Sequence, residues 1–333
     1  MNTVDFDKLF KNINQLKVGV IGDIMLDTYW WGKVDRISPE APVPVVAVTK
    51  REQRIGGAGN VALNIVGLGA SVSVISVLGD DDDGKLLTGL LEDNKIGTKY
   101  LAPSAARITT NKIRIISRNQ HMMRLDAEIT KMLSAEDERL LLNGFKKYLA
   151  EAKPDIVILE DYNKGVLTET AITSIIALCR ENNVLTAVDP KRKNFFAYRY
   201  ADIFKPNLHE AKEGLNIIGD EVSQTSLSKI HEALHAQLHH NISFITLSEK
   251  GVYYREGNNE QLISTHIRSI ADVSGAGDTV IAVASLVYAA SKDVQLMAEM
   301  ANIAGGLVCE EVGTVAINKE KFLAECKFLL AAP

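Results

Sequence analysis

Short apolar stretches alternate with helical segments along most of this chain, and that alternation limits the fold more than any other feature. Strands that are apolar at nearly every position must be covered on both faces, which is typical of a parallel sheet between helices. The sequence therefore predicts an α/β fold, a doubly wound, mostly parallel sheet with helices on both faces. We expect strands at residues 17–22, 71–78, 156–159, 184–188, 202–204 and 242–247, a hairpin at 252–264, and helices at 85–94, 134–150, 169–181, 208–214, 227–238, 275–290, 294–310 and 319–330.

Two β-rich segments, at residues 28–50 and 107–125, interrupt this rhythm. The first contains the run Arg-Ile-Ser-Pro-Glu-Ala-Pro-Val-Pro at 36–44, whose three prolines exclude a helix. In the second, lysines and arginines are interleaved with apolar residues. We expect both segments to form a small β lid inserted in a single domain that covers residues 1–333.

Composition and charge exclude several classes of function. The formal net charge of −5 argues against a nucleic-acid partner. The three cysteines form no Cys-x-x-Cys pair, which is typical of a reducing compartment. The N-terminal residues lack the pattern of a secretory signal, and no apolar stretch reaches the roughly 18 residues of a membrane span. We therefore expect a cytoplasmic protein without a membrane partner.

The run Asp-Val-Ser-Gly-Ala-Gly-Asp-Thr at residues 272–279 joins a polar loop to an apolar helix. Gly275 and Gly277 let the backbone approach a ligand, and a helix N-terminus carries about half a positive charge, so this turn can bind an anion. Asp278, in the first turn, can accept the proton of a hydroxyl that attacks phosphorus. An ordinary helix start, with Asp278 matching the helix dipole, explains the spacing equally well.

Asn207 and Glu210 follow the expected strand at 202–204 and lie one helical turn apart. Strand ends in open α/β sheets line the ligand site, and oxygen side chains there can hold the water shell of Mg²⁺. A helix cap at Asn207 is an equally good interpretation of the same residues.

A second glycine-rich helix start, Gly56, Gly57 and Asn60, and two aspartates after the first strand, Asp23 and Asp27, are candidates for sugar binding. Turn and capping roles are the alternative for the aspartates. Two further strand ends carry cations, and with two lid arginines they predict a pocket for a substrate that already bears phosphate. These candidates are Asp161, Lys164, Lys191, Arg118 and Arg124. Solvated surface cations are the alternative.

Two motifs match other functions less well. Residues 79–85 resemble a P-loop, but Leu86 stands where a hydroxyl must bind magnesium, and the four aspartates favour a turn that caps a helix. His231, Glu232 and His235 match the zinc hydrolase pattern His-Glu-x-x-His. A metallohydrolase is therefore our alternative from a different class, and a histidine-rich flank of a surface helix is the structural alternative.

The glycine-rich runs at 56–60 and 272–279 occur together in one family. The chain resembles the PfkB/ribokinase carbohydrate kinases over essentially its whole length. The runs at 36–44 and 161–165 (Asp-Tyr-Asn-Lys-Gly) make it most similar to the branch that phosphorylates D-glycero-β-D-manno-heptose 7-phosphate. Many members of this branch carry a second nucleotidyltransferase domain with a His-x-Gly-His motif. This sequence lacks that motif, so we expect a separate protein to carry out adenylyl transfer.

The resemblance implies a ribokinase-like fold and ATP-dependent transfer to O1 of heptose 7-phosphate, a step in lipopolysaccharide core (ADP-heptose) synthesis. It implies that Asp278 is the catalytic base and that the anion hole comprises Gly275, Ala276 and Gly277. Mg²⁺ would be held through water by Asn207 and Glu210, and in some members K⁺ lies beside the positions of Asp272 and Ser274. The nucleotide-lining positions are Ser248, Gly251 and Asn302.

The family's lid strands often pair across a homodimer, so the resemblance also implies a dimer. Two alternatives stay open. One is a kinase of another sugar or sugar phosphate, and the other is a nucleotide-binding regulator that transfers no phosphoryl group.

Overall fold

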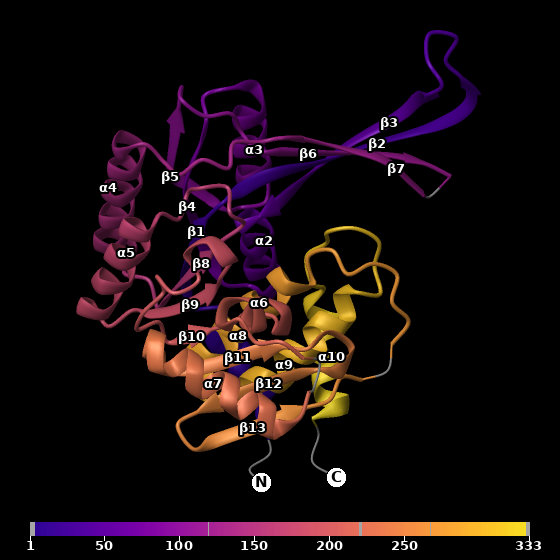
Figure 1. Ribbon diagram of the computed structural model, residues 1–333. Helices are drawn as coiled ribbons and strands as arrows, with labels where there is room; N and C mark the ends of the chain where they lie inside the picture. The colour runs from indigo at the N-terminus through magenta and orange to yellow at the C-terminus, as the bar shows by residue number, and fades with distance from the viewer. Residues whose placement is uncertain (1–3, 119, 220–221, 267, 331–333) are drawn as a thin grey trace.

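The computed structural model describes residues 4–118, 120–219, 222–266 and 268–330. These residues form a large sheet between two layers of helices, and a smaller sheet that projects from it (Figure 1). The predicted doubly wound α/β fold with an additional small sheet is thus confirmed.

The large sheet has the strand order β13-β12-β11-β10-β9-β8-β1-β4-β5. Among the described strands, β12 is antiparallel to both of its neighbours and the other pairs are parallel. The strands are β1 (Lys17–Gly22), β4 (Ser71–Gly79), β5 (Gly97–Ser104), β8 (Ile156–Glu160), β9 (Leu185–Asp189), β10 (Ile203–Phe204), β11 (Ile242–Thr246), β12 (Val252–Glu256) and β13 (Asn259–Ile263). Every residue of β8 is buried, as the apolar pattern predicts.

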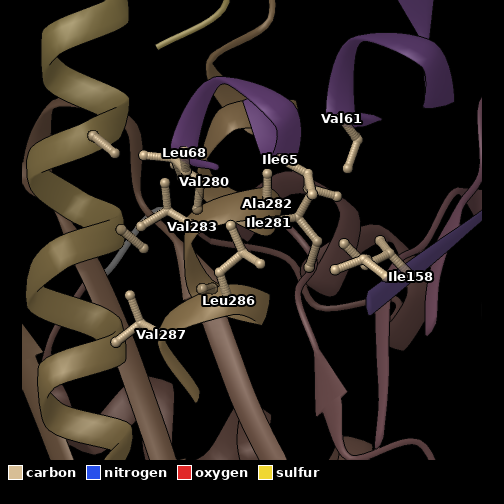
Figure 2. Packing of buried hydrophobic residues seen from close by; sticks show 14 of the residues in the cluster. Val61, Ile65, Leu68, Ile158, Val280, Ile281, Ala282, Val283, Leu286 and Val287 are labelled. Atoms are coloured by element: carbon tan, nitrogen blue, oxygen red, sulfur yellow. The ribbon is translucent and has the colours of Figure 1, made fainter. Parts of the chain in front are cut away.

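Helices cover both faces of this sheet, and each face has its own hydrophobic cluster beneath the helices. One layer contains α1 (Phe6–Ile13), α2 (Ala58–Leu68), α3 (Asp82–Asp93), α8 (Ala276–Ser291), α9 (Val294–Val308) and α10 (Lys319–Leu329). The other contains α4 (Ala135–Ala152), α5 (Glu169–Glu181), α6 (Leu208–Leu215) and α7 (Gln224–Leu238). Short 3₁₀ turns lie at Arg192–Asn194 and Ser248–Lys250. Figure 2 shows Ile281 of α8 packed near Ile65 of α2 and Ile158 of β8, which fixes the start of α8 against the sheet.

The small sheet has the order β3-β2-β6-β7 and contains β2 (Ile24–Ile37), β3 (Pro44–Gly57), β6 (Asn111–Ser117) and β7 (Gln120–Ala127). Its strands extend beyond the predicted segments 28–50 and 107–125, because β2 begins directly after Asp23 and β3 runs into α2. The long β2–β3 ribbon reaches well away from the large sheet in Figure 1.

Residues directly opposite each other in neighbouring strands share a face, so the register gives the small sheet two unlike faces. The charged face carries Asp27, Tyr29, Lys112, Arg114, Arg124 and Asp126. The apolar face carries Trp30, Ile113, Ile115, Met123 and Leu125. The ammonium of Lys112 lies 5.9 Å from the ring centre of Tyr162, in the loop after β8. The charged face is therefore turned toward the large sheet.

The chain runs from β1 outward to β4 and β5 and then returns to β8 on the other side of β1. Such a reversal of strand order is where open α/β sheets bind ligands, beyond the carboxyl ends of the strands. We call the ends of β1, β8, β9 and β10 the carboxyl edge. Asp23, Asp161, Asp189 and Asn207 all lie there.

Candidate active site

The start of α8 lies at the carboxyl edge and has the geometry of an anion-binding turn. Gly275 has a φ of 79°, and a Cβ at this residue would lie 2.8 Å from Nδ2 of Asn60, so both conformation and space require glycine. The N–H of Ala276 donates to the carbonyl of Val273 at 3.3 Å. The N–H groups of Gly277 and Asp278 have no acceptor within the helix, as is general for a first turn.

Asp278 is buried, with both carboxylate oxygens held by side chains from distant parts of the chain. Nδ2 of Asn60 donates to Oδ2 at 2.7 Å, and the hydroxyl of Tyr162 donates to Oδ1 at 2.5 Å. Burial raises the pKa of Asp278 to about 6, against the opposing effect of these two hydrogen bonds. The carboxylate is therefore mainly ionised at neutral pH yet more basic than an exposed aspartate, as a general base requires.

A second cluster of charged side chains lies at the end of β9, where Lys191 and Lys205 pair with Asp189. Nζ of Lys205 lies 2.8 Å from Oδ2 of Asp189, and both side chains are buried. Burial alone would raise the pKa of Asp189, but Lys191 and Lys205 outweigh it and the pKa is lowered. A Cβ on Gly277 would lie 3.8 Å from Asp189 and 3.9 Å from Lys205, so this pair lies directly beside the first turn of α8.

Glu160, the last residue of β8, is a third acid near Asp278 and Asp189. Its side chain is buried, and its Oε2 has no hydrogen-bond partner among the described atoms. Burial and the nearby Asp189 and Asp278 raise the pKa of Glu160 well above its ordinary value. A proton on Glu160 would remove one of three neighbouring negative charges.

Asn207 and Glu210 form the helix cap that was one of their two interpretations. The N–H of Glu210 donates to Oδ1 of Asn207 at 2.8 Å, and the N–H of Asn207 donates to Oε2 of Glu210 at 2.8 Å. Lys191 donates to Oε1 of Glu210 at 2.6 Å. Each carboxylate oxygen keeps a free lone pair, so the donor set also fits a Mg²⁺ ion held through water.

The structure gives Asp23 a structural task rather than a free carboxylate. Its oxygens accept the backbone N–H groups of Tyr162, Lys164 and Val166 at 2.9, 3.0 and 3.0 Å. Burial raises the pKa of Asp23 despite these bonds. The carboxylate therefore fastens the loop after β8 to the end of β1.

Asp27 is likewise engaged, because Arg114 donates to its Oδ1 at 2.5 Å. A Cβ on Gly56 would lie 2.5 Å from Oδ2 of Asp27, and Gly57 has a φ of 60°. Both glycines therefore let β3 turn into α2 close to the carboxyl edge. Of the predicted sugar ligands, Asn60 is the one in direct contact with Asp278, and its Oδ1 is buried without a partner in the described structure.

The predicted cationic pocket is only partly assembled in this chain. Lys164 pairs with Glu128 at 2.7 Å, and Lys191 lies between Glu210 and Asp189. Arg124 is on the charged face of the small sheet but pairs with Asp126.

Arg118 lies on the β6–β7 turn, about 20 Å along the strand from Lys112. From the small sheet, Lys112 approaches the loop after β8, and this residue was not among the predicted candidates.

The remaining candidates lie in the loop after β8 and in the segment before α8. Asp161 accepts bonds from the N–H of Asn163 and the hydroxyl of Tyr198, and burial raises its pKa to about 6. Asp272 binds the N–H and hydroxyl of Ser274 and the N–H of Gly313.

Of the predicted nucleotide-lining positions, Asn302 donates to the carbonyl of Ser264 at 3.0 Å. Ser248 is the first residue of a 3₁₀ turn and Gly251 follows that turn, with positive φ angles of 55° and 99°. Each position stays a prediction.

The histidine motif of α7 is arranged for packing. Nδ1 of His231 and Nε2 of His240 lie 2.8 and 2.6 Å from Oγ of Ser243, and Glu232 lies 3.5 Å from Arg255. Within the described ranges, no group of three or more His, Cys, Asp or Glu side chains is placed to hold a metal ion. This geometry does not support the metallohydrolase alternative. In the same ranges, no helix combines the length and apolar character that a membrane span requires.

Sequence reasoning missed Tyr162, Lys112, Lys205 and Glu160. Lys205 could have been selected from the sequence, because it directly follows an apolar strand and precedes Pro206. A lysine buried at such a position almost always has a charged partner, here Asp189. Tyr162 lies in the run at 161–165, but nothing in the sequence indicated its contact with Asp278, which is 116 residues away.

Comparisons with known proteins identify a family and a fold. The model of the pfkB family carbohydrate kinases matches residues 15–321. The bifunctional protein HldE of Syntrophotalea carbinolica is 38% identical over 325 residues, which are 96% of this chain and 65% of that protein. The chain thus spans slightly less than two thirds of the length of this relative.

Solved structures show the same fold at low sequence identity. Phosphofructokinase-2 from Escherichia coli in complex with potassium gives a TM-score of 0.76 at 17% identity, covering 93% of this chain and 99% of that one. Ribokinase from Arabidopsis thaliana, complexed with ribose and ATP, gives 0.70 at 16% identity, covering 93% and 99%. These likenesses show a ribokinase-like fold.

Proposed function

Because the chain belongs to the pfkB family of carbohydrate kinases, we propose that it transfers the γ-phosphate of ATP to O1 of D-glycero-β-D-manno-heptose 7-phosphate. The product would be the 1,7-bisphosphate, an intermediate of lipopolysaccharide core heptose synthesis. The observation that carries the kinase proposal is Asp278, a buried carboxylate held by two donors beside the first-turn amides of α8. The heptose assignment is supported by the motifs at 36–44 and 161–165 and by the relative named HldE.

In the proposed reaction, Asp278 accepts the proton of the O1 hydroxyl as that oxygen attacks the γ-phosphorus. The amides of the 275–278 turn and the Lys205 ammonium stabilise the negative charge of the transferred group. Asn207 and Glu210 would hold Mg²⁺ through water, where it would supply charge neutralisation of the ATP phosphates. A K⁺ ion beside Asp272 and Ser274 is part of the same proposal.

We assign the substrate's 7-phosphate to the space between the charged face of the small sheet and the loop after β8. Burial and the nearby Lys164 lower the pKa of Lys112, so a dianionic phosphate placed between the two ammonium groups would relieve their repulsion. The small sheet would then act as a lid that excludes water from the carboxyl edge. Arg118 and Arg124 would bind this phosphate only if the outer part of the small sheet approached the substrate.

A substrate panel tests the proposal. The purified chain is incubated with Mg-ATP and, in parallel, heptose 7-phosphate, fructose 6-phosphate or ribose, and the product linkage is determined by phosphorus NMR. We expect the highest kcat/KM with heptose 7-phosphate and a new phosphate at the anomeric carbon. Equal use of the three sugars would contradict the heptose assignment, and ATP binding without any transfer would favour the regulator alternative.

A further inference from the structure

The loop after β8 brings Tyr162 to the catalytic carboxylate, although the two residues are 116 positions apart in the sequence. Three backbone N–H groups of this loop bind the buried carboxylate of Asp23, and Gly165 adopts a φ of 93° where a Cβ would lie 2.2 Å from the carbonyl oxygen of Lys131. The loop is thus fixed at several points. Its rigidity means that the phenol is presented to α8 in a defined position.

The phenol of Tyr162 is a permanent hydrogen-bond donor in this environment. The ammonium groups of Lys112 and Lys191 lie 5.9 and 5.8 Å from its ring centre. Burial, and then the negative charges of Asp278 and Glu160, raise the pKa of Tyr162 well above its ordinary value. The hydroxyl therefore stays protonated at any working pH and donates a hydrogen bond to Oδ1 of Asp278.

A carboxylate that serves as a base must present a lone pair in one direction, and a single hydrogen bond leaves it free to rotate. Asn60 holds Oδ2 at 2.7 Å and Tyr162 holds Oδ1 at 2.5 Å, so the plane of the Asp278 carboxylate is fixed from both sides. Each oxygen keeps one lone pair for the attacking hydroxyl. The pair of donors therefore leaves the base both oriented and available.

We propose that Tyr162 is a positioning residue: its phenol, held by the loop that Asp23 fastens, orients the Asp278 carboxylate to receive the proton of the attacking hydroxyl. This inference rests on the proposed phosphoryl transfer. It does not depend on which sugar is the acceptor, because the contact that carries it joins the phenol hydroxyl to the base itself.

The proposal predicts a change in basicity as well as in rate. A hydrogen bond to an anion stabilises the anion, so Tyr162 lowers the pKa of Asp278 and its removal raises that pKa. In Tyr162→Phe, the acidic limb of the kcat–pH profile should move to higher pH by about one unit. At neutral pH, kcat should fall about tenfold or more while KM for ATP stays within about twofold, because the nucleotide phosphates are bound by other residues.

The matched control is Tyr100→Phe, because Tyr100 also donates its hydroxyl to a carboxylate, Oε2 of Glu151 at 2.7 Å, on the surface of the protein. Kinetics are measured with whichever sugar of the panel the wild type uses best, so loss of the heptose assignment leaves this test intact. The titration of Asp278 is also followed without turnover, by NMR of carboxyl-¹³C aspartate, with Asp278→Asn to assign the resonance.

A second replacement keeps the hydroxyl in place should Tyr162→Phe fold poorly. Incorporation of 3,5-difluorotyrosine at position 162 makes the phenol a stronger donor, so the pKa of Asp278 and the acidic limb should move to lower pH, opposite to Tyr162→Phe. The proposal is overturned if kcat, the acidic limb and the ¹³C titration of Tyr162→Phe all match those of wild type and Tyr100→Phe. It is also overturned if Tyr162→Phe raises kcat, since the phenol would then block the base rather than orient it.

Discussion

Asp278 concentrates the proposed chemistry in one side chain, so its replacement gives the most direct prediction at the scale of single residues. In Asp278→Asn the amide cannot accept a proton, and kcat should fall by about 10²- to 10⁴-fold with little change in ATP affinity. Initial rates and ATP titrations measure the two quantities. Asp82→Asn is the matched control, because Asp82 lies in the first turn of α3 with a fully exposed side chain. An Asp278→Asn variant with near wild-type turnover would remove the base from the mechanism.

The raised pKa of Asp278 also predicts the pH dependence of the reaction. Protonated Asp278 cannot act as a base, so kcat should rise with pH through the pKa of about 6 and level off above pH 7. The measurement is kcat at saturating sugar and ATP between pH 5 and 8, because a sugar phosphate itself titrates near pH 6 and affects kcat/KM. A profile that stays flat down to pH 5 would contradict a base with this pKa.

These residues differ in how far the sequence could reveal them. Asp278 was predictable because glycine and acid lie within one local run, and local geometry decides the start of a helix. Tyr162 and Lys112 were not, since their roles come from contacts between β8, the small sheet and α8. For Asp23 the sequence left sugar binding and a turn role both open, because it shows that an acid follows a strand but not that three backbone N–H groups bind the carboxylate.

The first turn of α8 supplies the prediction at the scale of elements. In Gly275→Ala, an L-residue at a φ of 79° with a Cβ 2.8 Å from Asn60 should lower the free energy of unfolding by about 1–2 kcal/mol. The same methyl displaces one of the two donors to Asp278, so kcat should fall as well. Chemical denaturation and initial rates measure the two effects.

Gly89→Ala is the same kind of substitution, but here we expect the free energy of unfolding to rise. Gly89 lies within α3, and a Cβ there meets no heavy atom within 4 Å. Alanine in place of glycine in a helix raises stability by about 0.5–1 kcal/mol, and kcat should not change. Equal effects of the two substitutions would mean that the turn at Gly275 imposes no special demand.

The helices and buried strands were the most predictable elements, because their apolar residues follow periods that local geometry sets. β5 (Gly97–Ser104) was missed, since this edge strand contains Gly97 and Pro103 and is only half buried. The capping interpretation of the acidic run at 80–83 was correct, as Asp81 accepts the N–H of Gly84 at 2.7 Å and caps α3, but the helix begins at Asp82, before the predicted residue 85. Sequence periodicity thus predicts what is buried more securely than what pairs at an edge.

The two faces of the small sheet have different surroundings in the whole molecule. Its charged face meets the carboxyl edge, which leaves Met123 and Leu125 on the apolar face 57% and 43% exposed. The sequence showed the β-rich segments and their cations, but the alternation of faces depends on the register between β2, β6 and β7, which pairs strands distant in sequence. That register also leaves β7 and β3 as open edges, a liability that native proteins usually cover.

A homodimer through this sheet would cover both the apolar face and an open edge, as we propose from the family resemblance. Light scattering of the wild type should then give twice the 36.4 kDa mass of the chain, and Met123→Lys should give the single mass, because a buried unpaired ammonium is costly. Phe328→Lys is the control, since Phe328 is 79% exposed on α10, away from the small sheet. If Phe328→Lys dissociates the dimer while Met123→Lys does not, the interface lies elsewhere. A wild type of single mass at working concentration would contradict the dimer.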